Sequence, residues 1–254
     1  MKKLMFAVAA MAAGIAVADI TSSNIVGYSN KAAEGNLNFY APQFVTVGCN
    51  TIDIQDIELK DTEGMVGYGD SMQIIGPLGN ATKSYSYWAG YMDPTMTVTK
   101  DFYWANDDLT PVVSSIDRAA GIAIDNASLI DFNLSNAGEV IAEDVTVPAE
   151  ANLNWLGNPF SANISIQDIE LKDTEGMVGY GDSLQIVGPL GNASESFSYW
   201  GGYMDPTSTV TKDFYWANDD LTPVEKTLKP GDGFAIDNAS ELVFDIVIKC
   251  PYSL

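Results

Sequence analysis

The sequence predicts an all-β protein made of two tandem repeated domains, each a β-sandwich or barrel-like body with one short helical turn. Three observations support this fold class. A long segment occurs twice at a constant offset of 112 residues. Its clearest local patterns alternate polar with apolar residues, which is the period of a β-strand. Glycine- and proline-rich turns separate these patterns.

The repeat is close and long. Residues 167–223 copy residues 55–111 with 50 of 57 positions identical. Upstream, NLNWLGNPF (152–160) answers NLNFYAPQF (36–44) at an offset of 116, so the first copy holds a four-residue insertion that contains Cys49. Two copies of about 112 residues suit single-domain size better than a solenoid. We therefore expect a first repeat domain over 19–138 and a second over 139–254.

Each unit carries the same expected elements. Ser84–Trp88 alternates serine with aromatic residues, and the turn after Asp70–Ile75 makes the two segments a hairpin. An N-cap residue and an acid three positions later predict a helical turn at Asp53–Asp56 and at Ser165–Asp168. Six to eight short strands are expected per unit. Further strands in the first copy are expected at Asn36–Tyr40, Thr97–Thr99, Gly121–Ile124 and Leu129–Leu134.

The faces of this hairpin follow from the differences between copies. Tyr85 becomes Phe197, so that position does not need a hydroxyl and is expected in the core. Trp88 and Trp200 stand on the opposite face of the strand, with the serines, and are expected to be exposed.

The first eighteen residues have the features of a secretory signal peptide. Lys2 and Lys3 precede an apolar run from Leu4 to Val17, and Ala16-Val17-Ala18 is an acceptable cleavage motif. The run stops short of the roughly 20 apolar residues that a membrane span needs. We expect a mature chain without a transmembrane segment, secreted to the cell surface or extracellular space, or held in the periplasm.

The charge balance of the chain argues against nucleic acid as a partner. The chain has 34 Asp and Glu against 12 Lys and Arg, giving a net charge of −22. Nucleic acid is not expected as a partner, because binding a phosphate backbone requires clustered basic residues. Polysaccharide or other surface proteins are the expected partner classes.

The sequence offers little for catalysis. It has no histidine and only two cysteines, which removes the usual catalytic triads and zinc sites. Carboxylate pairs can hydrolyse glycosides, but no pair is singled out here. We expect no enzyme activity, with a cryptic glycoside hydrolase as the remaining catalytic alternative.

No cofactor is expected, with calcium as the one alternative, because an acidic exported chain is rich in oxygen ligands. No spaced calcium-loop pattern occurs, so a solvated acidic surface is the competing interpretation. The calcium candidates are Asp70, Asp93, Asp107, Asp108, Asp182, Asp205, Asp219 and Asp220.

A carbohydrate-binding surface is a second interpretation. The segment from Trp88 to Trp104 and its copy mix aromatic rings with Asp and Asn, which suits stacking on sugars and hydrogen bonding to hydroxyls. The alternative is that the rings fill the core. The glycan-binding candidates are Trp88, Tyr91, Trp104, Trp200, Tyr203 and Trp216.

Cys49 and Cys250 are the only cysteines. Because exported proteins meet oxidising surroundings, a disulfide between them is a candidate link between the two units, although the sequence does not show that they lie close together.

The signal peptide, NIVGY (24–28), NLNWLGNPF, GDSLQIV (181–187) and LKPGDGFAI (228–236) together resemble a group of uncharacterised exported β-rich proteins of Planctomycetes–Verrucomicrobia–Lentisphaerae-type bacteria. The resemblance covers nearly the whole mature chain and implies a β-rich fold. It brings no catalytic residue. The expected function is a structural or adhesive protein of the cell surface or matrix, with a carbohydrate-binding module protein as the alternative.

Cleavage after Ala18 is directly testable. Because Ala16 and Ala18 satisfy the signal-peptidase rule, the exported protein should begin at Asp19. N-terminal sequencing of the secreted product checks this, and a product that still begins at Met1 contradicts it.

Overall fold

The computed structural model confirms the all-β fold. It describes residues 26–33, 36–61, 70–75, 81–127, 132–172, 182–188, 193–239 and 243–252; the expected signal segment lies outside these ranges. The helices among the described residues are three-residue 3₁₀ turns: η1 (Ile54–Asp56), η3 (Gly90–Met92), η4 (Ile166–Asp168) and η6 (Gly202–Met204). Asp53 caps η1 and Ser165 caps η4 through their side-chain oxygens, as the sequence predicts.

Each unit contains a five-stranded antiparallel sheet with the same strand order. In the first unit the order is β2 (Asn36–Tyr40), β10 (Ile122–Asn126), β6 (Ser71–Ile75), β7 (Ala81–Ala89) and β8 (Phe102–Ala105). In the second unit it is β13 (Asn152–Gly157), β20 (Gly233–Asn238), β16 (Ser183–Val187), β17 (Ala193–Gly201) and β18 (Phe214–Ala217). The expected hairpin is the β6–β7 pair, with a register shift beside Ile75.

A smaller sheet lies beside each five-stranded sheet. In the first unit β11 (Phe132–Val140) pairs with β1 (Val26–Ala33), β3 (Phe44–Val45) and β5 (Ile57–Asp61). In the second, β21 (Asp245–Ile248) lies between β12 (Val145–Pro148) and β15 (Ile169–Lys172). Two short pairs complete the fold: β4 (Thr51–Asp53) with β9 (Ser115–Asp117), and β14 (Ile164–Ser165) with β19 (Thr227–Leu228).

Three details differ from the sequence prediction. The described units hold eleven and ten strands instead of six to eight, because several pairs are only two or three residues long and leave no periodic pattern. Thr97–Thr99 is loop, not strand. The expected boundary after residue 138 falls inside β11, whose Glu139 pairs with Val26 and Val45. The first unit therefore extends through Val140.

The ring faces of β7 and β17 are as predicted. Tyr85 and Phe197 are buried in the core, and Trp88 and Trp200 lie on the opposite face, where each is half-buried rather than fully exposed. The adjacent Tyr87 and Tyr199 also point into the core. The hydroxyl of Tyr199 accepts a hydrogen bond from the backbone N–H of Leu171 on the facing small sheet.

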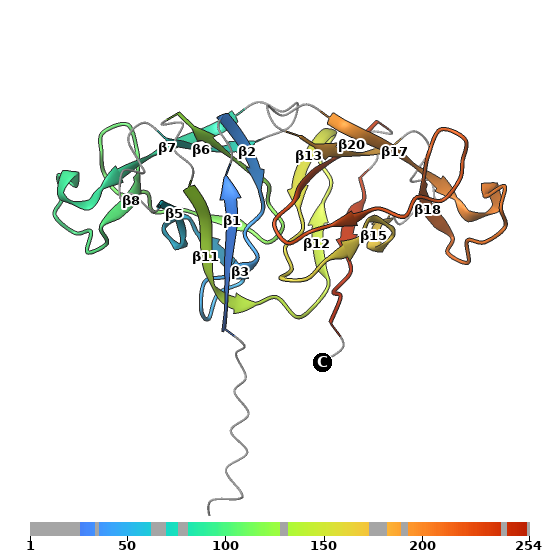
Figure 1. The fold of residues 1–254 in the computed structure, drawn as a ribbon, viewed down its shortest axis with the longest axis horizontal. Coiled ribbons are helices and arrows are strands. Elements are labelled where there is room, and N and C mark those ends of the chain that lie inside the picture. The colour runs from blue at the N-terminus through green and yellow to red at the C-terminus, as the bar shows by residue number, and fades with distance from the viewer. Residues whose placement is uncertain are drawn as a thin grey trace, which may run out of the picture.

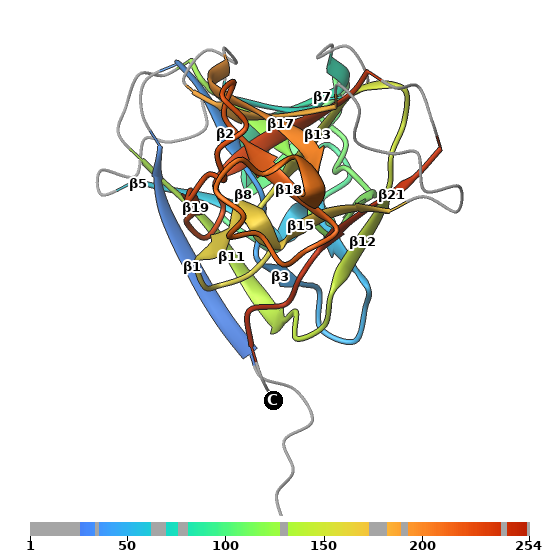
Figure 2. The same cartoon turned by 90° about the vertical axis from the view of Figure 1, so that its right-hand side faces the viewer.

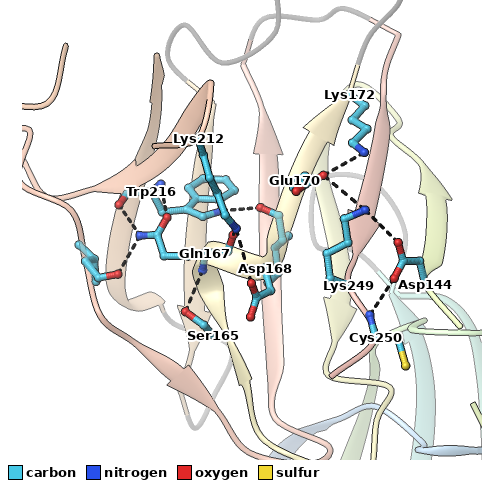
Figure 3. A network of polar contacts seen from close by, with 12 residues as sticks. Asp144, Ser165, Gln167, Asp168, Glu170, Lys172, Lys212, Trp216, Lys249 and Cys250 are labelled. Carbon is cyan, nitrogen blue, oxygen red and sulfur yellow. Dashed lines mark hydrogen bonds and ion pairs between the residues drawn. The ribbon is translucent and has the colours of Figure 1, made fainter. Parts of the chain in front are cut away.

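A glutamine links the 3₁₀ turn of each unit to its last sheet strand; Figure 3 shows this link in the second unit. The side-chain amide of Gln167 donates to the carbonyls of Trp216 and Val224, both at 2.8 Å, and its oxygen accepts from the Trp216 N–H at 3.1 Å. The buried Trp216 indole donates to the Ile169 carbonyl at 2.8 Å. Gln55 makes the same contacts with Trp104 and Val112. We call this arrangement the glutamine bracket.

The two units lie side by side along the long axis of the molecule, with β7 and β8 toward one end and β17 and β18 toward the other (Figure 1). Viewed along that axis, the second unit lies in front of the first (Figure 2). Buried apolar side chains form one continuous cluster through both units. The units are therefore joined by packing as well as by the chain.

The interface between the units has approximate two-fold symmetry. Tyr40 forms a β-bridge with Asp232, and Leu156 forms one with Ala120. Leu156 is the repeat equivalent of Tyr40, and Asp232 of Ala120, so the same contact is made twice. Phe39 and its equivalent Trp155 stack on each other, with ring centroids 5.0 Å apart. This is the pattern of an isologous dimer interface, formed here within one chain.

The glutamine bracket gives a stability prediction. Gln167→Glu keeps the size of the side chain and its acceptor for the Trp216 N–H but removes both donated hydrogen bonds. It should lower the free energy of unfolding by about 1–3 kcal/mol, because two half-buried carbonyls lose their donor. Gln185→Ala, which removes a half-buried glutamine from β16, is the control and should cost less. Urea unfolding of the full chain measures both, and equal costs would contradict the bracket's role.

Candidate functional site

The most distinctive surface feature is a loop repeated at both ends of the molecule. Residues 90–101 join β7 to β8, and residues 202–213 join β17 to β18; the two segments differ only at Met96 and Ser208. We call them the tip loops. Figure 1 shows them at opposite ends of the long axis. They therefore face away from each other.

A short hydrogen bond closes the base of each tip loop. The N–H of Gly90 donates to the carbonyl of Asp101 at 2.6 Å, and Gly202 donates to Asp213 at the same distance. A Cβ atom at position 90 would lie 2.1 Å from the Lys100 carbonyl oxygen. Only glycine therefore allows the two ends of the loop to approach this closely.

A buried carboxylate organises the interior of each tip loop. One oxygen of Asp93 accepts from the N–H and hydroxyl of Thr95, at 2.8 and 2.6 Å. The other accepts from the N–H groups of Thr97 and Val98, at 2.7 and 2.9 Å. Asp205 repeats this set with the same distances. The carboxylate thus replaces the backbone pairing that an irregular loop lacks.

The hydrogen bonds also fix the charge of these carboxyls. Burial acts to raise the pKa of Asp93, but the hydrogen bonds from Thr95, Val98 and Thr97 outweigh it and hold that pKa far below its ordinary value. The pKa of Asp205 is lowered in the same way. Both tip loops are therefore held by an ionised carboxylate at any moderate pH.

The glycan-binding candidates separate into three pairs. Tyr91 and Tyr203, on the tip loops, have 82% and 81% of their side-chain surface exposed. Trp88 and Trp200 are half-buried on the outer face of the sheet beside the loops. The expectation for Trp104 and Trp216 is wrong: both are fully buried and form part of the glutamine bracket. The last strand of each sheet is covered on both faces, because three successive residues, Tyr103–Ala105 in β8 and Tyr215–Ala217 in β18, are all buried.

The structure does not gather the calcium candidates. Asp93 and Asp205 are occupied by the tip loops, and Asp108 and Asp220 each accept two hydrogen bonds from the threonine two residues later. Within the described residues no group of three or more Asp, Glu or Cys side chains is placed to hold a metal ion. The remaining candidates are the exposed Asp107 and Asp219 and the buried Asp70 and Asp182.

The candidate disulfide is not formed: both cysteines are free. Cys49 is an exposed free thiol in the insertion of the first unit, and Cys250 is a half-buried free thiol that follows β21. The backbone N–H of Cys250 donates to Asp144 (Figure 3). Packing at the two-fold interface holds the units together without this link.

The threonines that order the tip loops were not identified from the sequence. Their signal was present: an aspartate followed at two and four residues by threonine is a pattern in which the acid accepts local backbone N–H groups. From the sequence, Asp93 and Asp205 are expected only as calcium ligands. Their role in the structure is to shape the loops.

Comparison with protein-family models, curated proteins and solved structures found no match to this chain. The resemblance to exported β-rich bacterial proteins therefore stays a prediction. In the described part of the chain, no helix has the length and apolar character required to cross a membrane. The geometry of the tip loops is accordingly the main basis for a functional proposal.

The tip-loop carboxylates give a prediction in two parts. Asn at position 93 offers one oxygen where Asp offers two, so either the Thr95 donors or those of Thr97 and Val98 lose their acceptor. Amide hydrogen exchange of Asp93→Asn should be faster at one of these sets. Asp108→Asn is the control, because a single oxygen of Asp108 accepts both bonds from Thr110.

The same variant tests the pH dependence. A carboxyl whose pKa is lower in the folded than in the unfolded chain stabilises the fold at any pH above its unfolded pKa of about 3.9. This stabilisation is lost as the pH falls through the folded pKa. The difference in free energy of unfolding between wild type and Asp93→Asn should therefore be largest at neutral pH and disappear in strong acid. A difference that persists in strong acid, or unchanged exchange at all three amides at neutral pH, contradicts the assignment.

Proposed function

We propose that this chain is an exported, acidic, structural or adhesive protein of the cell surface or extracellular matrix, which bridges two partners and has no catalytic activity. The observation that carries the proposal is the pair of nearly identical tip loops at opposite ends of one body with a continuous core. Two equal sites that face apart cannot both bind one compact partner. They suit the linking of two separate ones.

The tip loops have the physical properties of attachment points. Each presents a tyrosine that is largely exposed, on a loop whose backbone is already ordered by Asp93 or Asp205. A preordered loop loses little conformational entropy on binding, and tyrosine supplies large contact area with few rotatable bonds. Binding at two such points is strengthened by avidity where both are engaged.

The absence of catalysis is also a proposal, and the carboxylates support it. Glycoside hydrolysis requires one carboxylic acid with a raised pKa. Every described carboxyl whose pKa departs clearly from its ordinary value is shifted downward. These are Asp93, Asp108, Asp144, Glu170, Asp205 and Asp220. These six carboxyls are therefore poor candidates for such an acid.

A carbohydrate-binding role remains a second candidate for the same tip loops. Tyr91 and Tyr203 are exposed, and the half-buried Trp88 and Trp200 lie on the strands that lead into the loops. An aromatic ring with nearby amides and hydroxyls is suited to a sugar face. Polysaccharide and surface protein are therefore the two partner classes to be separated by experiment.

The bridging proposal predicts that binding and cross-linking can be separated. With envelope fragments of the producing cells, wild type should both bind, measured by sedimentation, and cross-link, measured by light scattering. Tyr91→Ser or Tyr203→Ser alone should retain binding through the other tip loop but lose cross-linking, with apparent affinity reduced by about a hundredfold or more. The double variant should lose both.

Val113→Ser is the matched control, because it removes an apolar side chain that is 97% exposed and lies outside the tip loops. Periodate treatment of the fragments should abolish binding if the partner is polysaccharide, and protease treatment should do so if it is protein. Full cross-linking by either single tyrosine variant would overturn the proposal.

A further inference from the structure

A groove runs along one side of the interface between the two units. Its volume is about 500 Å³, within the usual range for small-molecule sites. The second unit contributes Glu150 and Trp155 to its wall, and the first contributes Thr82, Asp117 and Arg118, with apolar side chains between them. This groove is separate from both tip loops.

Two N–H donors of the groove lining lack acceptors. The indole Nε1 of Trp155 and the guanidinium Nε of Arg118 are both buried and make no hydrogen bond to any described residue. The other guanidinium nitrogens are occupied: Nη1 pairs with Glu143, and Nη2 donates to the Asn50 side chain at 2.9 Å. Buried donors without partners are rare in native proteins and call for an explanation. Turning the Trp155 N–H toward the groove would break no hydrogen bond, whereas the Arg118 Nε belongs to the same planar group as the two occupied nitrogens and stays where they hold it.

The equivalent side of the interface is closed in a different way. There, Lys31 donates to the Gly231 carbonyl and pairs with Asp232, both at 3.0 Å. The repeat equivalents of Lys31 and Asp232 on the groove side are Val147 and Ala120, which cannot form this ion pair. The groove side thus lacks the closing pair.

The groove side also differs from the closed side in the chemistry of its other residues. Trp155 of the second unit stands where the first unit has Phe39. Arg118 of the first unit stands where the second unit has Pro230. Asp117 of the first unit stands where the second unit has Lys229. The groove lining thus differs in chemistry from the equivalent positions of the other side, while the two tip loops are almost identical.

We infer that this groove binds a neutral saccharide, with Trp155 donating to its oxygens and Asp117 and Glu150 accepting from its hydroxyls. A sugar hydroxyl accepts and donates hydrogen bonds at once, which matches a site that holds both an N–H donor and exposed carboxylates. The indole ring and its apolar neighbours supply the surface that the carbon face of a sugar packs against.

The charges of the site favour a neutral ligand over an acidic one. The single cation of the described lining is Arg118, and its charge is already paired with Glu143. Asp117 and Glu150 lie on the groove, and the whole chain has a net charge of −22. An anionic sugar would be repelled by this field. A neutral sugar is not.

The inference stands independently of the tip-loop proposal and has its own test. The probes are cellotetraose and the tetramer of N-acetylglucosamine, with tetragalacturonate as the acidic comparison, titrated into the full mature chain by calorimetry up to millimolar concentration. At least one neutral probe should bind and shift the indole N–H resonance of Trp155. Trp155→Phe, which restores the residue found at position 39, should weaken binding by about threefold to tenfold through loss of one hydrogen bond.

Asp117→Lys, on an exposed residue, is the second groove variant and should also weaken binding. Val113→Ser, at an exposed position outside the groove and the tip loops, is the control and should leave binding unchanged. The inference is overturned by any of three results: no neutral probe binds, tetragalacturonate binds better than the neutral probes, or Trp155→Phe binds as wild type does.

Discussion

The architecture depends on the glutamine bracket, in which one side-chain amide satisfies three backbone groups of a neighbouring segment. Gln55 joins the η1 turn to β8 through Trp104 and Val112, and the Trp104 indole donates back to the Ile57 carbonyl at 2.6 Å. The two sheets of the unit are thereby tied across the core. Lys100, at the end of the tip loop, donates to the Gln55 carbonyl at 2.5 Å. The position of the tip loop therefore follows from the bracket.

Charge is distributed so that the few cations stabilise particular junctions. In the second unit Lys249 pairs with Asp144 at 2.9 Å and lies 3.6 Å from Glu170, which also pairs with Lys172 (Figure 3). Hydrogen bonds from the Cys250 N–H and from Lys249 lower the pKa of Asp144. Exposed pairs of this kind contribute about 0–1 kcal/mol each. Here they place the charge of Lys249 between Glu170 of β15 and Asp144, the residue before β12.

Local patterns were sufficient to predict much of each unit. The serine–aromatic alternation of Ser84–Trp88 identified both the strand and its buried face, and the capping residues Asp53 and Ser165 identified both 3₁₀ turns. These features depend only on neighbours in sequence. Trp104 was misassigned because its burial depends on Gln55, a residue 49 positions away. No local pattern reports such a contact.

The same limit explains why the groove was not predicted. Its two sides come from different units, and they meet only because the repeat packs on itself about a two-fold axis. The sequence did carry a trace of it, since Trp155, Arg118 and Asp117 each replace a residue of different chemistry in the other copy. Those differences were visible in the alignment of the repeats. That these positions line the same groove follows only from the packing of the two units.

Placing both copies in one chain has a consequence that a dimer of identical units could not have. In a symmetric homodimer any change at an isologous interface appears twice, so the Lys31–Asp232 pair would close both sides. In this chain the pair closes one side, and Val147 and Ala120 leave the other open. The tip loops, which lie far from the axis, kept their sequence at both ends. The duplicated chain thus combines two equal ends with an unequal centre, and only the centre can hold a single, distinct ligand.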